Sequence, residues 1–128
     1  METLRRVSVR TAADSWLVHA EAVQIGGDLL VYLWGGERPH IGAVAAAQPR
    51  PSLSGDGSTS ATASVLAFPG HKEDQVVKTV AEALSARLKS NVVVTAGLHW
   101  DNLPPDAIAE VMERCREIAK LLLSALAT

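Results

Sequence analysis

Alternating apolar and polar positions predict two strands at the start of the chain, over residues 4–10 and 15–25. In the second segment, apolar side chains occupy one face and a mixture of polar and aliphatic side chains occupies the other. The two sets are Trp16, Val18, Ala20 and Ala22 on the first face, and Leu17, His19, Glu21 and Val23 on the second. We therefore expect one side of this strand to lie against the core.

Three shorter apolar segments follow and also fit strands. They span residues 29–34, 41–47 and 60–68, and the Gly-Gly-Asp sequence at 26–28 predicts a turn before the first of them. The first two segments are apolar almost throughout, which is typical of strands covered on both faces. A second subunit is one way to cover the second face.

The hydrophobic period becomes helical near residue 72. Apolar residues over 72–89 recur with helical spacing, residues 91–98 are rich in valine and predict a strand, and Pro105 suits the start of a second helix. The apolar stripe of that helix is Ile108, Val111, Met112, Cys115, Ile118, Ala119 and Leu122. We therefore expect an α+β fold of order βββββαβα, with a six-stranded, mainly antiparallel sheet and two helices on one face.

The order of the elements also predicts which ends meet. Strands 41–47 and 60–68 are expected to be antiparallel neighbours, and the helix over 72–89 would make strand 91–98 parallel to strand 60–68. This topology places a set of polar residues at one rim of the sheet and the loop 48–59 at the opposite end. The predicted rim set is Arg38, His40, His71, Lys72, His99 and Asp101.

The composition fits one soluble domain over residues 1–128. The chain is 48% hydrophobic, and a chain of this length buries roughly two-thirds of its unfolded surface. A net charge of −2 argues against a nucleic-acid binder, and no segment resembles a signal peptide or a membrane span, so a cytoplasmic location is expected. The single cysteine, Cys115, excludes an intramolecular disulfide, and its apolar stripe predicts buried packing.

One segment with phosphate-binding chemistry lies between a strand and a helix. Gly70, His71 and Lys72 precede the helix, where free N–H groups and the helix dipole attract anions. In the alternative interpretation, Glu73 and Asp74 already satisfy this helix end.

The Pro-, Gly- and Ser-rich loop 48–59 is a second candidate. A loop of this length in a small domain is either functional or mobile. It offers Arg50, Ser52 and Ser54, whose guanidinium and hydroxyl groups suit a phosphate or a carboxylate. In a dimer, this loop could reach the histidine rim of the partner.

The histidines allow more than one interpretation. His40, His71 and His99 match a three-histidine zinc set in number, but no HxH or HxxxH spacing supports a metal, so we expect none. They fit polar groups at a ligand rim, exposed loop residues or a general base. Trp100 is the best candidate to stack on an aromatic ligand, whereas Trp34 is expected in the core or at an interface.

Several motifs in order resemble one known family. They read PHIGAVA at 39–45, PRPSLS at 49–54, SATASV at 60–65, FPGHKED at 68–74 and NVVVTAGLHWDN at 91–102. Together they resemble the prenylated-flavin chaperone family (LpdD-like, similar to the D subunit of gallate decarboxylase), over about residues 16–126. The resemblance implies a fold similar to that of proteasome assembly chaperones, which dimerise through their sheets.

The resemblance further implies a non-enzymatic homodimer that binds FMN or prenylated FMN and delivers it to a UbiD-type decarboxylase. The flavin prenyltransferase is an expected further partner. From their chemistry, the residues expected to hold the phosphate, the ribityl group or the ring edge are His40, Arg50, Ser52, Ser54, Gly70, His71, Lys72 and His99. One alternative is a structural accessory subunit of a gallate-type decarboxylase with no cofactor of its own, and another is a small metal-dependent enzyme.

Overall fold

A computed structural model describes residues 4–68 and 73–128 of the chain. These residues form the expected order of elements. The strands are β1 (Arg5–Arg10), β2 (Val18–Ile25), β3 (Asp28–Gly36), β4 (Ala43–Pro51), β5 (Thr59–Ala67) and β6 (Val92–His99), and the helices are α1 (Asp74–Leu88) and α2 (Ala107–Leu126). The predicted α+β class is confirmed.

The strands of the described residues form one mixed sheet in the order β1-β2-β3-β6-β4-β5. β3 and β6 pair in parallel, and the other neighbours are antiparallel. β4 lies between β5 and β6 and is antiparallel to both, so β5 and β6 run in the same direction. The predicted direction of β6 is therefore confirmed, although β5 and β6 are not adjacent.

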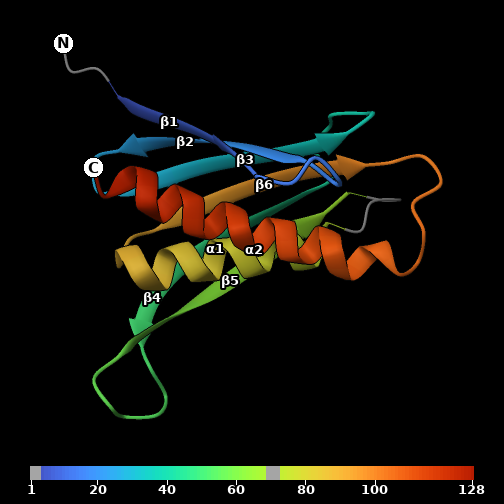
Figure 1. Ribbon diagram of the computed structural model, residues 1–128. Coiled ribbons are helices and arrows are strands. Elements are labelled where there is room, and N and C mark those ends of the chain that lie inside the picture. The colour runs from blue at the N-terminus through green and yellow to red at the C-terminus, as the bar shows by residue number, and fades with distance from the viewer. Residues whose placement is uncertain (1–3, 69–72) are drawn as a thin grey trace.

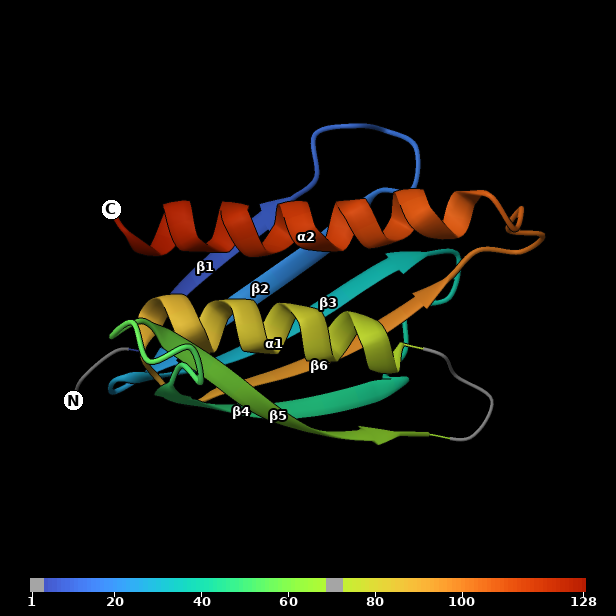
Figure 2. The ribbon, with the colours of Figure 1, turned by 90° about the horizontal axis from the view of Figure 1, so that it is seen from below.

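Both helices pack side by side on one face of the sheet (Figures 1 and 2). α1 contacts β4, β5 and β6, whereas α2 contacts β1 and β2. The core between them is built from small and branched aliphatic side chains, and Val77, Val80 and Leu84 of α1 are fully buried. Burial of each of these larger side chains stabilises the fold by about 1.5–3 kcal/mol.

The opposite sheet surface, which we call the open face, is not covered by any of the described elements. Strand pairing places side chains there in rows that cross the sheet, because residues paired between strands point to the same face. The central row is Glu21, Tyr32, Thr95, Val44 and Leu66. The sheet face that the sequence leaves to a partner is therefore present in the structure.

The second strand begins later than the pattern predicts. β2 starts at Val18 rather than at residue 15, because the chain forms a turn there and Trp16 takes a left-handed φ of 54°. Thr11 closes this turn: its N–H donates to the Val18 carbonyl at 3.0 Å, and its hydroxyl accepts from the Val18 N–H at 3.1 Å.

The predicted loop 48–59 is shorter in the structure. β4 continues to Pro51 and β5 begins at Thr59, so the loop is confined to residues 52–58. Pairing of β4 with β6 ends at Ala47, and beyond it β4 and β5 form a two-stranded hairpin. Prolines are tolerated in this part of β4 because the edge that faced β6 now has no neighbouring strand. A residue without an N–H group therefore removes no hydrogen bond along that edge.

Candidate functional site

The segment between β3 and β4 crosses the end of β6 at Gly97. A Cβ atom at Gly97 would lie 1.6 Å from the His40 carbonyl oxygen, so the crossing requires glycine there. The Gly42 N–H donates to the Ala96 carbonyl at 2.8 Å, and the Phe68 N–H donates to the Gly42 carbonyl at 2.9 Å. These contacts place His40 at the rim where β6 ends, as the topology predicts.

His40 makes a close contact with the buried carboxylate of Glu73, the residue that precedes α1. His40 Nε2 lies 3.0 Å from Glu73 Oε1, and Nδ1 lies 2.8 Å from the Arg38 carbonyl oxygen. Glu73 Oε1 also accepts from the Leu98 N–H at 3.2 Å. One carboxylate therefore joins the start of α1, the end of β6 and the crossing segment.

Glu73 packs tightly against the crossing segment. Its side chain is only 7% exposed, and among the described residues its Oε2 atom has no hydrogen-bond partner. A Cβ atom at Gly42 would lie 2.2 Å from Oε2, so the carboxylate lies directly against this glycine. A buried carboxylate is costly unless an opposite charge and hydrogen bonds compensate it, which makes the contact with His40 important.

A second, exposed polar cluster lies at the same rim. Asp101 Oδ1 is 2.9 Å from His99 Nε2 and 3.8 Å from Arg38 Nη2, and the Asp101 N–H donates to a Glu37 carboxylate oxygen at 2.9 Å. The hydrogen bond with His99, helped by the charge of Arg38, lowers the pKa of Asp101 below its usual value. These side chains are about half exposed or more, so the cluster contributes little to stability.

On the open face, a hollow of about 420 Å³ lies beside this rim, and we call it the rim hollow. It is lined by Leu30, Tyr32, Leu33, Trp34, Pro39, His40, Ile41 and Thr95. It combines aromatic rings, aliphatic side chains and a few polar groups, which is typical of a site for a largely apolar small molecule.

The aromatic wall of the rim hollow continues across the open face. The rings of Tyr32 and Trp34 stack at 6.0 Å between centroids, and Trp34 stacks on His19 at 5.3 Å. The Tyr32 hydroxyl donates to Glu21 Oε1 at 2.8 Å, and this bond raises the pKa of Tyr32. The tyrosine ring is therefore fixed in place beside the hollow.

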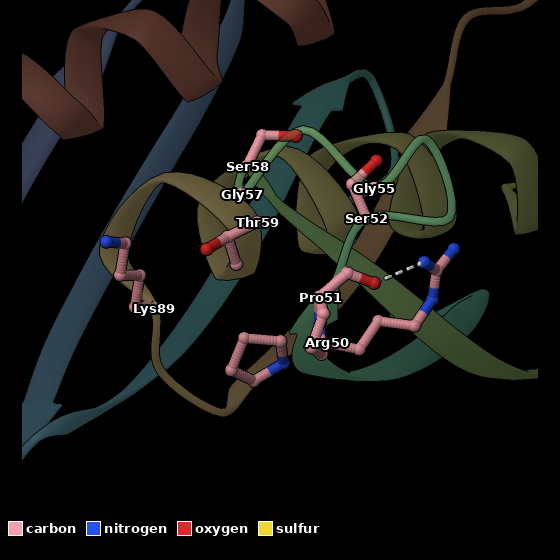
Figure 3. Close-up of a pocket in the computed structure, with 9 residues that line it drawn as sticks. Arg50, Pro51, Ser52, Gly55, Gly57, Ser58, Thr59 and Lys89 are labelled. Atoms are coloured by element: carbon pink, nitrogen blue, oxygen red, sulfur yellow. Dashed lines mark hydrogen bonds between the residues drawn. The ribbon is translucent and has the colours of Figure 1, made fainter.

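A second hollow, of about 410 Å³, lies at the β4–β5 hairpin, and we call it the hairpin pocket (Figure 3). Its lining residues are Pro49, Arg50, Pro51, Ser52, Gly55, Gly57, Ser58, Thr59 and Lys89. The cations come from two elements, since Arg50 belongs to β4 and Lys89 ends α1 with a left-handed φ of 53°. Two cations and several hydroxyls suit an anion.

Hydrogen bonds order the side chains of this hairpin. Arg50 donates through Nε to Thr62 Oγ1 at 2.7 Å and through Nη1 to the Pro51 carbonyl at 3.1 Å. The hydroxyls of Ser52 and Ser54 lie 3.0 Å apart. Asp56 accepts from the backbone and hydroxyl of Ser58, and these bonds lower the pKa of Asp56 to about 2.

The structure separates the candidate binding residues into two groups. His40 and His99 lie at the rim, whereas Arg50, Ser52 and Ser54 lie at the hairpin, the opposite end of β4, as the topology predicts. The segment of β4 between Ala43 and Arg50 alone spans roughly 23 Å at 3.3 Å per residue. The remaining candidates, Gly70, His71 and Lys72, lie outside the described residues.

Other sequence interpretations can also be located. Cys115 is fully buried, and burial raises the pKa of its thiol to about 12, so the predicted packing role is confirmed. Trp100 packs partly buried against the core and meets Trp16 edge to face at 5.6 Å. Within residues 4–68 and 73–128, no group of three or more histidine, cysteine or acidic side chains is placed to hold a metal.

The sequence did not identify Glu73, Tyr32 or Lys89 as parts of these sites. Glu73 fits the usual acidic residue at a helix start, and its burial depends on contacts with β6 and the crossing segment. Tyr32 and Trp34 are two residues apart on β3, so both rings point to the open face. This spacing is the sequence signal that could have predicted an aromatic surface there.

None of the helices in the described part of the chain is long and apolar enough to cross a membrane. No curated protein matches the sequence. A chain from a crystal structure of a chaperone complex for yeast 20S proteasome assembly is similar in fold, with a TM-score of 0.62 and 12% identity over 94% of this chain and 96% of that one. The family model of the prenylated flavin chaperone LpdD-like domain matches residues 12–127. The chain therefore belongs to the prenylated flavin chaperone LpdD-like family.

Proposed function

We propose that this protein binds prenylated FMN and holds it for transfer to a UbiD-type decarboxylase. Family membership supports the chaperone role. The observation that carries the proposal for the site is the rim hollow, which lies beside a stack of aromatic rings on an uncovered sheet face. The protein would act as a carrier, so the flavin chemistry itself would take place in the decarboxylase.

The residues of the rim hollow fit the ring system of this ligand. A prenylated flavin has a flat aromatic ring system, an added apolar ring and a polar ribityl phosphate. Tyr32 and Trp34 offer aromatic surface, Leu30 and Ile41 offer aliphatic surface, and His40 lines the same hollow. Aromatic stacking would orient the ring, and burial of apolar surface would supply most of the binding free energy.

The phosphate needs a separate set of donors. In our proposal the donors to the ribityl phosphate are His99 and the exposed Arg38. Gly70, His71 and Lys72 stay candidates from their chemistry in the sequence alone. Arg50 and the hairpin serines lie beyond the reach of a ribityl chain that starts in the rim hollow of the same protomer. If these residues hold the phosphate, they must belong to a second copy of the chain that packs against the rim hollow. If they do not, they form an anion site separate from the flavin site.

Titration of the protein with FMN and with prenylated FMN, followed by flavin absorbance and fluorescence, tests binding. Ile41→Ala should weaken binding of prenylated FMN by on the order of tenfold, since it removes part of an apolar wall worth about 0.8 kcal/mol per methylene. The matched control is Ile108→Ala, because Ile41 and Ile108 are similarly exposed (59% and 57%) but Ile108 lies on α2. Equal affinity of the two variants would place the flavin elsewhere.

Delivery is tested in the same preparation by mixing the loaded protein with decarboxylase apoenzyme. We expect the decarboxylase to become active faster than with the same concentration of free cofactor. If the wild-type protein binds neither flavin but still associates with the decarboxylase, a structural accessory role is favoured instead. The apolar middle of the open face, with Leu30, Trp34 and Val93, is the observation that supports that second candidate, because exposed apolar patches mark protein interaction sites.

A further inference from the structure

We infer that a further hollow on the open face, which we call the polar hollow, binds the pyrimidine edge of the flavin ring system, where one N–H group lies between two carbonyl oxygens. The inference rests on the proposed function and deepens it, because it fixes how the ring lies in the site. It depends on three observations: the chemistry of the polar hollow, its position beside the rim hollow, and the distance that the two hollows span.

The polar hollow has a volume of about 370 Å³ and lies where β4, β5 and β6 meet, near the start of β6. Ala47 and Val92 form its floor, and both are buried in the core on the helix side of the sheet. The hollow is therefore open towards the side away from the helices. The residues that line it are Ala46, Ala47, Gln48, Thr62, Ser64, Asn91, Val92 and Val93.

The polar groups of this hollow are all neutral. Gln48 and Asn91 carry amides, and Thr62 and Ser64 carry hydroxyls, so each of the four groups can both donate and accept a hydrogen bond. Among the residues that the structure describes, the side chains of Gln48, Asn91 and Ser64 form no hydrogen bond. The hollow thus suits an uncharged group that presents donors and acceptors together.

The polar hollow adjoins the rim hollow with no strand between them. Leu30 lines the rim hollow and is paired directly with Val93, which lines the polar hollow. Thr95 also lines the rim hollow, two residues beyond Val93 on the same face of β6. One flat ligand can therefore lie along the strands and reach both hollows.

The distance between the hollows fits a flavin ring. Tyr32 of the rim hollow shares a row with Val44, and Val44 lies four residues before Gln48 on β4. Four residues of a strand span roughly 13 Å at 3.3 Å per residue. This is close to the length of three fused six-membered rings and one hydrogen bond.

The polarity of the hollows fits the two ends of that ring. The dimethylbenzene end of a flavin is apolar and suits the rim hollow, where Trp34 and Ile41 lie. The pyrimidine end is polar and suits the amide of Gln48 and the hydroxyl of Ser64. The ribityl chain leaves the central ring, so its phosphate can still turn towards the rim. Gln48 and Ser64 would thus determine the orientation of the ring.

The test compares FMN with its N3-methyl derivative, which keeps the ribityl phosphate but has no N–H group on the pyrimidine edge. In titrations followed by flavin fluorescence, the wild-type protein should bind FMN on the order of tenfold more tightly, because the methyl group removes a hydrogen bond and leaves its acceptor unpaired. Gln48→Leu should weaken FMN binding by a similar factor and abolish the discrimination. The matched control, Gln75→Leu, changes an exposed glutamine on α1, across the sheet from the open face (Figure 2), and should leave both unchanged.

Ser64→Ala is a second variant, and it should reduce the discrimination without removing it. Gln48 and Ser64 are exposed, so both variants should retain the fold, and circular dichroism verifies this. Equal wild-type affinity for the two flavins, or discrimination that survives in folded Gln48→Leu protein, would overturn the inference and leave the proposed function intact. A wild-type protein that binds neither FMN nor prenylated FMN would overturn the proposed function itself.

Discussion

At the scale of single residues, the glycines at the crossing segment decide whether the rim can form. We expect Gly97→Ala to destabilise the protein by at least about 1–3 kcal/mol, since the new Cβ would meet the backbone of His40 rather than a flexible side chain. Urea unfolding measures the loss. Gly27→Ala is the matched control, because no described atom lies within 4 Å of the Cβ position there and its φ is not positive. If both variants unfold at the same urea concentration, the crossing geometry is wrong.

Cys115 leads to a prediction about pH. Its thiol is fully buried, with a pKa raised to about 12, whereas an unfolded thiol titrates near 8.5. The folded state therefore keeps a proton that the unfolded state releases, so this group lowers stability as pH rises from about 8.5 towards 12, by ~1.4 kcal/mol per pH unit. Comparison of unfolding curves for wild-type and Cys115→Ala proteins at pH 7 and pH 10 isolates this contribution.

The same residue offers a direct chemical check. At pH 8, a thiol reagent should modify Cys115 in urea but not in the native protein, because only a thiolate accessible to solvent reacts. Rapid modification of the native protein would show that α2 does not pack as described.

At the scale of elements, the hydrophobic period was sufficient to predict the order and type of the strands and helices. Element boundaries were less predictable, because they depend on contacts between distant residues. The turn before β2 is closed by Thr11 across seven positions, and the end of β4 depends on pairing with β5. Proline-rich sequence suggested a loop at 49–51, but it is compatible with a strand edge that β6 does not reach.

The site was predictable to the extent that topology determines it. Counting strand directions was enough to bring His40 and His99 to one rim and to place Arg50 at the other end. The sequence could not show that Glu73 is buried, because an acidic residue before a helix is normally exposed there. It also could not show that Trp34 and Tyr32 border a hollow, since that depends on the crossing segment that carries His40 and on Gly97 beneath it.

At the scale of the whole molecule, the two sheet faces are unequal, and we propose that a second copy of the chain covers the open face. In the row next to the central one, Val93 pairs with Leu30 on one side and Ala46 on the other, and Val93 is 36% exposed. The middle strands of this face carry aliphatic and aromatic side chains such as Leu30, Trp34 and Val93, and such a patch is typical of an interface core, where charged residues are depleted. Pairing about a two-fold axis would use the same surface on both copies.

Val93→Arg tests this arrangement. The variant would bury an unpaired charge at the interface of each copy, which costs several kcal/mol, so the dimer should dissociate into folded monomers. Sedimentation velocity measures the change, and circular dichroism confirms that the fold is kept. Ile108→Arg is the matched control, because Ile108 is an exposed aliphatic side chain on α2, which lies on the opposite side of the sheet. A wild-type protein that sediments as a monomer at high concentration would contradict pairing through the open face, and the rim hollow would then be open to solvent and complete within one chain.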